Sequence, residues 1–253
     1  MGPPPRRLRA DRAPVLTIRR LAFAAALYLC ILIAGVLYIP FLLGPRRLAL
    51  RMVTVWAAVL QACFQTIMGV RIEVRGLEHR PTGPALIAGK HQSMLDTVWP
   101  FSVLDDTCFV FKKELLRTPF VGWYAAKTGM IPVDREAHAS ALKQMVRDAR
   151  NRLSSERQIV IFPEGTRTAP GAEPNYKPGV AALYRDLDLP CHLIATNSGT
   201  CWPAHGIGFN PGVVIFEFLP PIPAGLKRGD FMRELEHRLE AAGAAMPGGR
   251  PAA

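Results

Sequence analysis

The sequence predicts an α/β domain preceded by a membrane-anchoring helical hairpin, and two observations carry this prediction. Most of the apolar excess lies before residue 71, in two long stretches. From Arg71 onward, short apolar runs alternate with segments of helical periodicity, which is typical of α/β domains. At 253 residues, the chain has room for one substantial domain plus an anchor.

The first apolar stretch, Leu21 to Leu43, contains no charged residue. As a helix it would be about 35 Å long, enough to reach across the hydrocarbon core of a bilayer. A second stretch, Met52 to Val70, follows a Gly44-Pro45 break, so residues 21–70 are predicted to form a two-helix anchor. A cleaved signal peptide is the alternative, but its apolar region would be shorter, and Gly44-Pro45-Arg46 is a poor cleavage site.

The net charge of +11 is concentrated at the N-terminus, where residues 1–51 contain nine Arg and a single acid, Asp11. A basic segment beside an apolar run indicates contact with anionic lipid headgroups rather than with nucleic acid. Residues 1–20 are rich in Pro and Arg and are predicted to be poorly ordered. Because Arg clusters on both sides of the first stretch prefer the cytoplasmic side, we expect a hairpin that lies in one leaflet, or dips into the bilayer and returns, rather than one that crosses it.

The five cysteines form no CxxC pair and are predicted to be free thiols in a reducing compartment, without a structural metal. Other common sites are excluded by their spacing. The segment Gly83 to Lys90 differs from a phosphate-binding P-loop at two required positions, where Pro84 and His91 stand. The sequence also has no GxSxG elbow and no HExxH helix.

The strands of the α/β domain are predicted from short apolar runs, and its longer helices from one-sided apolar periodicity. Helices are expected over residues 136–155 and from about Phe231. The expected strands are Arg71–Arg75, Ala85–Ala88, Thr107–Phe111, Met130–Val133, Ile159–Phe162, His192–Ala195 and Val213–Phe218.

A candidate catalytic pair follows the strand Ala85–Ala88. His91 lies where α/β sheets usually place ligand chemistry, at the carboxyl end of a strand. If Ser93 caps the next helix, His91 precedes that helix and can fold back toward Asp96, which would hold the imidazole as a general base. The alternative is a capping box in which Asp96 only serves the helix terminus.

A second candidate segment is Ile161–Thr168, where an apolar strand ends in a turn. Gly165 lets the backbone approach a ligand, Thr166 offers a hydroxyl, and Arg167 offers a planar fork that suits phosphate oxygens. Glu164 and Arg167 could equally form a surface ion pair. A third candidate, Asp134-Arg135 at the end of Gly129–Arg135, is by itself more often a structural salt bridge.

Together, these segments resemble the glycerolipid acyltransferase family, specifically its bacterial 1-acyl-sn-glycerol-3-phosphate acyltransferases. The resemblance spans roughly residues 71–220 and covers four blocks, which are His91 to Asp96 (HxxxxD), Gly129 to Arg135, Phe162 to Arg167 (FPEGTR) and Asn197 to Gly199. Lys112 to Leu115 and Pro119 to Trp123 resemble the family's intervening segment. Two departures are Lys90, where the family commonly has Asn, and Leu193, near which its fourth block usually has Pro.

The resemblance implies a mixed sheet flanked by helices over residues 71–245, and direct transfer from an acyl thioester to the sn-2 hydroxyl of lysophosphatidate. His91 would be the general base, Asp96 would orient it, and backbone N–H groups near Gly165 could stabilise the oxyanion. The acceptor phosphate would be held by Arg135 and Arg167, with Glu164 and Thr166 as further candidates.

The same resemblance implies partners and a location. Acyl-CoA or acyl carrier protein would supply the acyl group, no metal or redox cofactor would be needed, and membrane lipids would surround the hairpin. The domain would face the cytoplasm at a bacterial inner membrane. Two alternatives stay open, an acyltransferase acting on another lysolipid such as a lyso-ornithine lipid, and a non-catalytic membrane scaffold or acyl-carrier docking protein.

Overall fold

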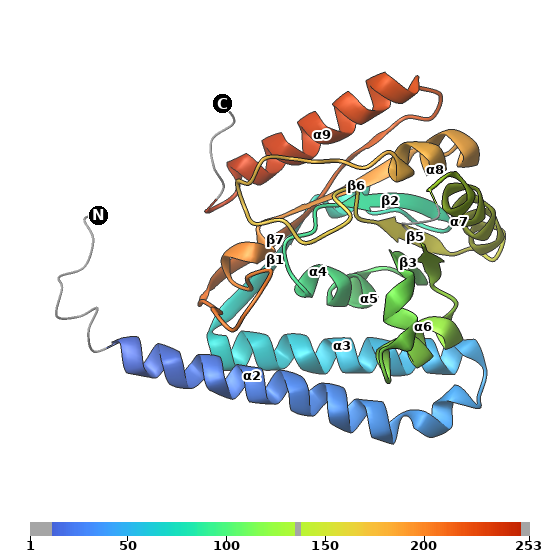
Figure 1. Ribbon diagram of the computed structural model, residues 1–253. Helices are drawn as coiled ribbons and strands as arrows, with labels where there is room; N and C mark the ends of the chain where they lie inside the picture. Colours follow the sequence, from blue (N-terminus) through green and yellow to red (C-terminus); the bar gives the residue numbers. More distant parts are fainter. Residues whose placement is uncertain (1–11, 135–137, 249–253) are drawn as a thin grey trace.

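The N-terminal part of the protein is a helical hairpin (Figure 1). In the computed structural model, which describes residues 12–134 and 138–248, helix α2 (Arg12–Leu37) and helix α3 (Arg46–Met68) are joined by the short helix η1 (Ile39–Leu42). Both helices begin earlier than predicted.

The expected disorder of residues 1–20 is therefore wrong for residues 12–20, which belong to α2. The remainder of that prediction lies outside the described residues. The physical reason is a tertiary contact, because the Arg20 guanidinium donates to Phe209 O and to Asn210 Oδ1, each over 2.7 Å.

Seven strands form one mixed sheet in the order β1-β7-β6-β2-β5-β3-β4. Strand β7 pairs antiparallel with β6, and all other neighbouring pairs are parallel. The predicted α/β fold with a mixed sheet is confirmed. The strands are β1 (Val70–Arg75), β2 (Ala85–Gly89), β3 (Thr107–Lys112), β4 (Ile131–Val133), β5 (Gln158–Ile161), β6 (Cys191–Thr196) and β7 (Gly212–Ile222).

Helices cover both faces of the sheet (Figure 1). One face is covered by α7 (His138–Leu153), α8 (Gly179–Leu187) and α9 (Arg228–Ala245). The other face carries α4 (Leu95–Val98) and α5 (Pro100–Val103), with the hairpin beneath them. The shorter elements are α6 (Val121–Thr128), η2 (Leu77–His79), η3 (Lys113–Arg117) and η5 (Ser198–Thr200).

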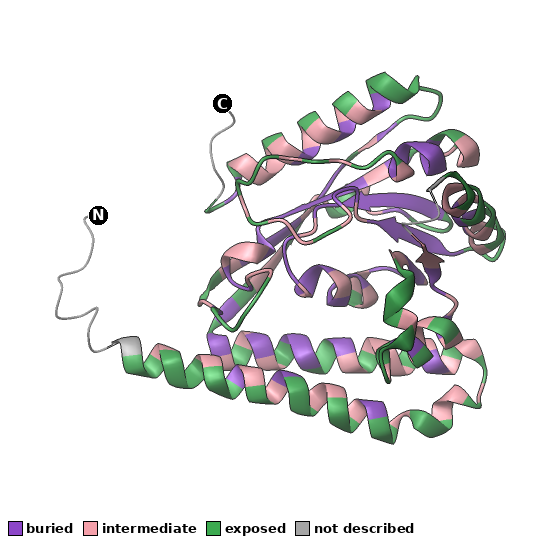
Figure 2. Ribbon diagram, viewed as in Figure 1, coloured by how far each residue is buried: buried purple, intermediate pink, exposed green. Residues whose placement is uncertain are grey.

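The central strands of the sheet are buried (Figure 2), and the two faces of the sheet have different cores. Alternate residues of a strand point to opposite faces, so Ile87 faces the hairpin while Leu86 and Ala88 face the three long helices. The core on the hairpin side is rich in aromatic residues, whereas the core under α7 to α9 is mostly aliphatic. The aromatic members of the first core include Phe23, Phe64, Trp99, Phe109, Trp202, Phe209, Phe216 and Phe218.

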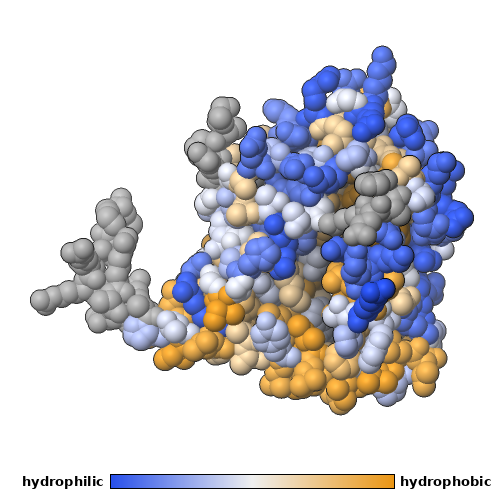
Figure 3. All heavy atoms as spheres, viewed as in Figure 1, coloured by the Kyte–Doolittle hydropathy of each residue, from blue (hydrophilic) through white to orange (hydrophobic). Residues whose placement is uncertain are grey.

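The hairpin packs on the domain with one face and leaves an apolar face exposed. Phe23 is fully buried, with its ring centre 4.7 Å from that of Phe209 and 4.9 Å from that of Phe64. On the opposite side, Leu29 and Leu32 are each 54% exposed. Figure 3 shows an apolar band along this edge of the molecule. Both helices are long and apolar enough to cross a membrane, as far as length and composition decide.

A partly buried ion-pair cluster fixes the start of α3 to the sheet. The Arg46 guanidinium binds both carboxylate oxygens of Asp106, over 2.9 and 2.6 Å. Arg157, which is almost fully buried, donates from Nε to the same carboxylate over 2.9 Å and from Nη1 to Gly129 O over 2.7 Å. The hairpin is therefore held to the domain by directional bonds as well as by apolar packing.

Candidate active site

The predicted blocks come together at one edge of the sheet. Strands β2, β5 and β6 are parallel neighbours, so their carboxyl ends lie at the same edge. The chain leaves β2 into residues 90–94, here called the His91 loop, which leads to Asp96 in α4. The turns after β5 and β6 lie beside this loop, and Thr168 N–H donates to His91 O over 2.8 Å. Such an edge is where α/β sheets usually bind ligands.

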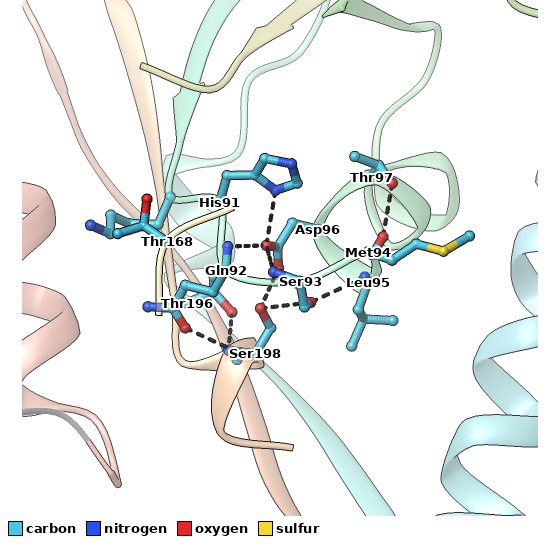
Figure 4. Close-up of polar contacts among 12 residues, drawn as sticks. His91, Gln92, Ser93, Met94, Leu95, Asp96, Thr97, Thr168, Thr196 and Ser198 are labelled. Atoms are coloured by element: carbon cyan, nitrogen blue, oxygen red, sulfur yellow. Dashed lines mark hydrogen bonds and ion pairs between the residues drawn. The ribbon is translucent and has the colours of Figure 1, made fainter. Parts of the chain in front are cut away.

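His91 and Asp96 face one another as the first block requires (Figure 4). The distance from His91 Nδ1 to Asp96 Oδ2 is 3.3 Å. The imidazole is 15% exposed and the carboxylate only 2%. With Nδ1 directed at the carboxylate, Nε2 is the ring nitrogen that can take a proton from a substrate.

Asp96 also holds the loop together. The expected capping box is wrong, because Met94, and not Ser93, is the N-cap of α4 and makes no side-chain cap bond. Asp96 Oδ2 accepts the N–H groups of Gln92 and Ser93, over 2.6 and 2.8 Å. Its Oδ1 accepts the Ser198 hydroxyl, which comes from the turn after β6. Because these donors fix the carboxylate, it presents a constant geometry to His91 (Figure 4).

The imidazole lies against an aromatic ring from the FPEGTR block. The ring centres of His91 and Phe162 are 4.2 Å apart, with 16° between the planes. Phe162 in turn stacks on Phe109 at 5.8 Å. Two sides of the imidazole are thus set by Asp96 and by Phe162, which restricts its rotation.

The FPEGTR block forms a tight turn after β5. Gly165 has φ of +71°, a conformation that favours glycine, and its N–H donates to Phe162 O over 3.0 Å. In this geometry the Gly165 N–H itself is engaged within the turn, so stabilisation of an oxyanion by backbone N–H groups near Gly165 stays a prediction for its neighbours. Thr166 is exposed. Within the described part of the chain, Arg167 makes no hydrogen bond or ion pair, which leaves its guanidinium available to a ligand.

Glu164 differs from the expectation that it helps to hold the acceptor phosphate. Its side chain is 1% exposed and points inward. Oε1 lies 2.6 Å from Lys90 Nζ, and Oε2 accepts His91 N–H over 3.0 Å. A buried carboxylate with both oxygens engaged cannot donate to a phosphate and would repel it. Arg135, the other predicted phosphate ligand in this region, lies outside the described residues.

Two cavities flank the carboxyl edge of the sheet. The first, of about 270 Å³, is almost entirely apolar and lies between the hairpin and α4 to α6. Met94 and Thr97 line it beside the His91 loop, and Ala34, Gly35 and Trp56 line it from the hairpin. The second, of about 510 Å³, lies on the side of α7 and α8 and is lined by the turn from Phe162 to Thr166 and by Lys177.

Comparison with known proteins places this site in a family. A family model described as "Acyltransferase" matches residues 71–196. A 1-acyl-sn-glycerol-3-phosphate acyltransferase of Pseudomonas aeruginosa is 36% identical over 70% of this chain and 69% of its own length. The chain belongs to the acyltransferase family.

More distant relatives and a solved structure agree with this assignment. The alpha form of 1-acyl-sn-glycerol-3-phosphate acyltransferase from Bos taurus is 32% identical over 65% of this chain and 58% of its own length. The fold is similar to a crystal structure of the 1-acyl-sn-glycerophosphate acyltransferase PlsC from Thermotoga maritima. That match has a TM-score of 0.70 and 19% identity, and it covers 90% of this chain and 97% of that one.

Sequence reasoning missed two polar contacts that reach the site from distant parts of the chain. Ser198 was seen only as part of a block, without a role, and its bond to Asp96 depends on the neighbouring strands β2 and β6. Glu240 of α9 contacts Lys90 over 2.7 Å. The available signal was Lys90 itself, because a lysine directly after a buried strand needs an acidic partner.

Proposed function

We propose that this protein transfers a fatty acyl group from an acyl thioester to the sn-2 hydroxyl of 1-acyl-sn-glycerol-3-phosphate, giving phosphatidic acid. The observation that carries the proposal is the oriented pair of His91 and Asp96 beside an apolar cavity. The names of the relatives support the same acceptor and product.

In the proposed reaction, His91 Nε2 removes the proton of the acceptor hydroxyl as the oxygen attacks the thioester carbonyl carbon. The tetrahedral intermediate then collapses, the carbon–sulfur bond breaks, and the thiolate leaves with the proton from the imidazolium. Asp96 stabilises the imidazolium across the 3.3 Å contact. General base catalysis of this kind contributes about 10²- to 10⁴-fold to the rate.

The acceptor phosphate is proposed to bind at the outer side of the FPEGTR turn. Arg167 supports this because its guanidinium has no partner in the described residues, and a planar fork suits phosphate oxygens. Thr166, which is exposed on the same turn, adds a hydroxyl donor. Arg135 stays a predicted ligand from the sequence alone.

The apolar cavity is proposed to hold the acyl chain of one reactant. It lies between the hairpin and the residues Met94 and Thr97 that flank Asp96, so a chain that enters from the lipid would end near the catalytic pair. Its walls offer almost no polar surface, as an alkyl chain requires. Acyl-CoA and acyl carrier protein are both candidate donors.

The hairpin is proposed to lie in the cytoplasmic leaflet of a bacterial inner membrane, and not to cross it. The α/β domain lies along most of the hairpin's length (Figure 1), so a hairpin perpendicular to the membrane would carry polar surface into the hydrocarbon. Membrane lipids then contact the exposed side of α2.

The proposal is tested with membranes from cells that produce the protein, supplied with radiolabelled lysophosphatidate or lyso-ornithine lipid and either donor. We expect phosphatidic acid from lysophosphatidate, and at least a 10²-fold loss in His91→Ala. His237→Ala, an exposed histidine on α9, is the matched control. Product from the lyso-ornithine lipid alone would change the acceptor, and no product from either lipid would favour a scaffold.

A further inference from the structure

A second polar network lies behind the His91 loop, and the proposed reaction does not use it. Lys90 Nζ lies 2.6 Å from Glu164 Oε1 and 2.7 Å from Glu240 Oε1. The side chain of Lys90 is only 7% exposed. Tyr176 completes the network, since its hydroxyl donates to Glu240 Oε1 over 2.9 Å and its ring centre lies 5.5 Å from Lys90 Nζ.

This network reaches the catalytic loop through one bond. The second oxygen of Glu164 accepts the backbone N–H of His91 over 3.0 Å. A continuous series of contacts therefore runs from Glu240 through Lys90 and Glu164 to His91. Glu240 belongs to α9, which lies beyond the family match at residues 71–196. Helix α9 is thus connected to the backbone of His91 through Lys90 and Glu164.

The charges explain why Lys90 is needed. Burial raises the pKa of the Glu164 carboxyl, Lys90 opposes that rise, and Glu240 adds to it. A protonated Glu164 would lose its charge-assisted bonds to Lys90 Nζ and to His91 N–H. Two carboxylates share one ammonium here, so removing the ammonium alone leaves like charges together in a buried site.

We infer that Lys90 and Glu240 are positioning residues, in which Lys90 keeps Glu164 ionised and directed at His91 N–H, and Glu240 holds Lys90 in place. The inference rests on the proposed function, because His91 is the base being positioned. The alternative is a purely structural tie between α9 and the sheet.

The two roles predict different behaviour when both charges are removed. If the contact only ties α9 to the sheet, Lys90→Asn and Glu240→Gln each break it to the same extent, and combining them does not restore it. In a positioning pair, Lys90→Asn alone leaves Glu164 facing Glu240, whereas adding Glu240→Gln removes that repulsion.

The experiment is a double-mutant cycle with Lys90→Asn, Glu240→Gln and the combined variant, each assayed with lysophosphatidate. We expect kcat to fall on the order of 30-fold in Lys90→Asn with little change in the acceptor KM, and to return to within about 3-fold of wild type in the combined variant. Glu240→Gln alone should cost roughly 3- to 10-fold. Glu234→Gln, which breaks the Arg238 pair on the same helix, should change nothing.

The pH profile adds a readout that a structural tie would not move. The charged and titratable side chains near Glu164 are Lys90 and Glu240, with Tyr176 and Glu236 behind them, and His91 contacts it through its backbone N–H. Because Glu164 must be ionised and His91 neutral, activity falls as pH drops through the pKa of either group. Removing Lys90 raises the pKa of Glu164, so the acidic limb of kcat should move to higher pH.

A substrate-free measurement separates this inference from the proposed function. Hydrogen exchange of the peptide containing His91 N–H should be faster in Lys90→Asn than in wild type, and should slow again in the combined variant. Wild-type membranes inactive on every lysolipid would overturn the proposed function only. The positioning role would be overturned if the losses of kcat multiplied in the combined variant, hydrogen exchange at His91 N–H did not slow again, and the acidic limb of kcat did not move.

Discussion

The His91 loop and the hairpin are held in place by different forces. The loop is held by the single carboxylate of Asp96, which accepts hydrogen bonds from Gln92 N–H, Ser93 N–H and the Ser198 hydroxyl. The hairpin is placed chiefly by buried aromatic area, with the ion pair between Arg46 and Asp106 at one end. Directional bonds fix atoms to within fractions of an ångström, whereas apolar area fixes only an approximate position.

This difference predicts which changes each region tolerates. In the loop, an isosteric change that alters one donor or acceptor should cost most, because it leaves buried polar groups unpaired. In the hairpin, a change of volume should cost most, because the cavity it creates loses packing contacts. The predictions below test this contrast, starting with the largest effect.

Asp96→Asn keeps the shape of the side chain at position 96 and removes its negative charge. The amide nitrogen cannot accept the N–H bonds now made to Asp96, and the imidazolium loses its counter-ion. We expect kcat to fall on the order of 10³-fold, comparable with carboxylate-to-amide changes in other His-carboxylate pairs. Steady-state turnover at saturating acceptor and donor measures this.

The control for this prediction is Asp105→Asn. Asp105 is an exposed carboxylate, 3.2 Å from Arg80 at the surface, and pairs of this kind contribute little. Unchanged turnover in both variants would mean that the loop does not depend on the Asp96 charge, and the contrast with the hairpin would be lost.

Phe23→Ala tests the hairpin by volume. The ring is fully buried between the hairpin and the turn that carries Trp202 and Phe209. Its removal should destabilise the docked hairpin by about 3–5 kcal/mol. Thermal unfolding in lipid nanodiscs measures the loss. Leu32→Ala is the matched control, since Leu32 is 54% exposed on the lipid-facing side and its truncation should leave the melting temperature nearly unchanged.

The sequence was sufficient for the local elements of both regions. Six of the seven predicted strands lie within one residue of their observed bounds, because buried strands appear in the sequence as short apolar runs between turns. The exception is β7, which continues four residues beyond the predicted end at Phe218. The pairing of His91 with Asp96 was also predictable, because it needs only that a loop of a few residues folds back toward the next helix. The start of α2 was not predictable, because Arg20 is held by Phe209 and Asn210, which are about 190 residues away.

The surroundings of Glu164 were not predictable for a similar reason. Both expected roles, at the acceptor phosphate and in a surface ion pair with Arg167, place it on an exposed turn, and nothing local indicates that Lys90 binds it and that Glu240 lies behind Lys90. The partner on α9 is 76 positions further along the chain and belongs to no motif. Contacts between elements distant in sequence depend on the sheet order, which periodicity does not encode.

Arg167→Lys tests the outer side of the FPEGTR turn. Among the described residues, Arg167 has no hydrogen-bond or ion-pair partner there. If Arg167 binds the acceptor phosphate with its planar fork, a point charge cannot replace both bonds. We expect the acceptor KM to rise about 10-fold with kcat nearly unchanged. Arg147→Lys, an exposed arginine on α7, is the control. An unchanged KM would move the phosphate site elsewhere.

Ala34→Phe is the change that connects the two regions, because Ala34 belongs to the hairpin yet lines the apolar cavity beside the His91 loop. A phenyl ring would occupy part of the roughly 270 Å³ and shorten the space for an alkyl chain. We expect a preference shifted toward shorter chains by about 10-fold, since each methylene in an apolar pocket is worth about 1–3 kcal/mol at most. Varying the chain length of donor and acceptor separately shows which reactant occupies the cavity, because only that reactant's dependence should move. If the chain-length dependence changes for neither reactant, the cavity does not hold an acyl chain, and the hairpin serves only as an anchor.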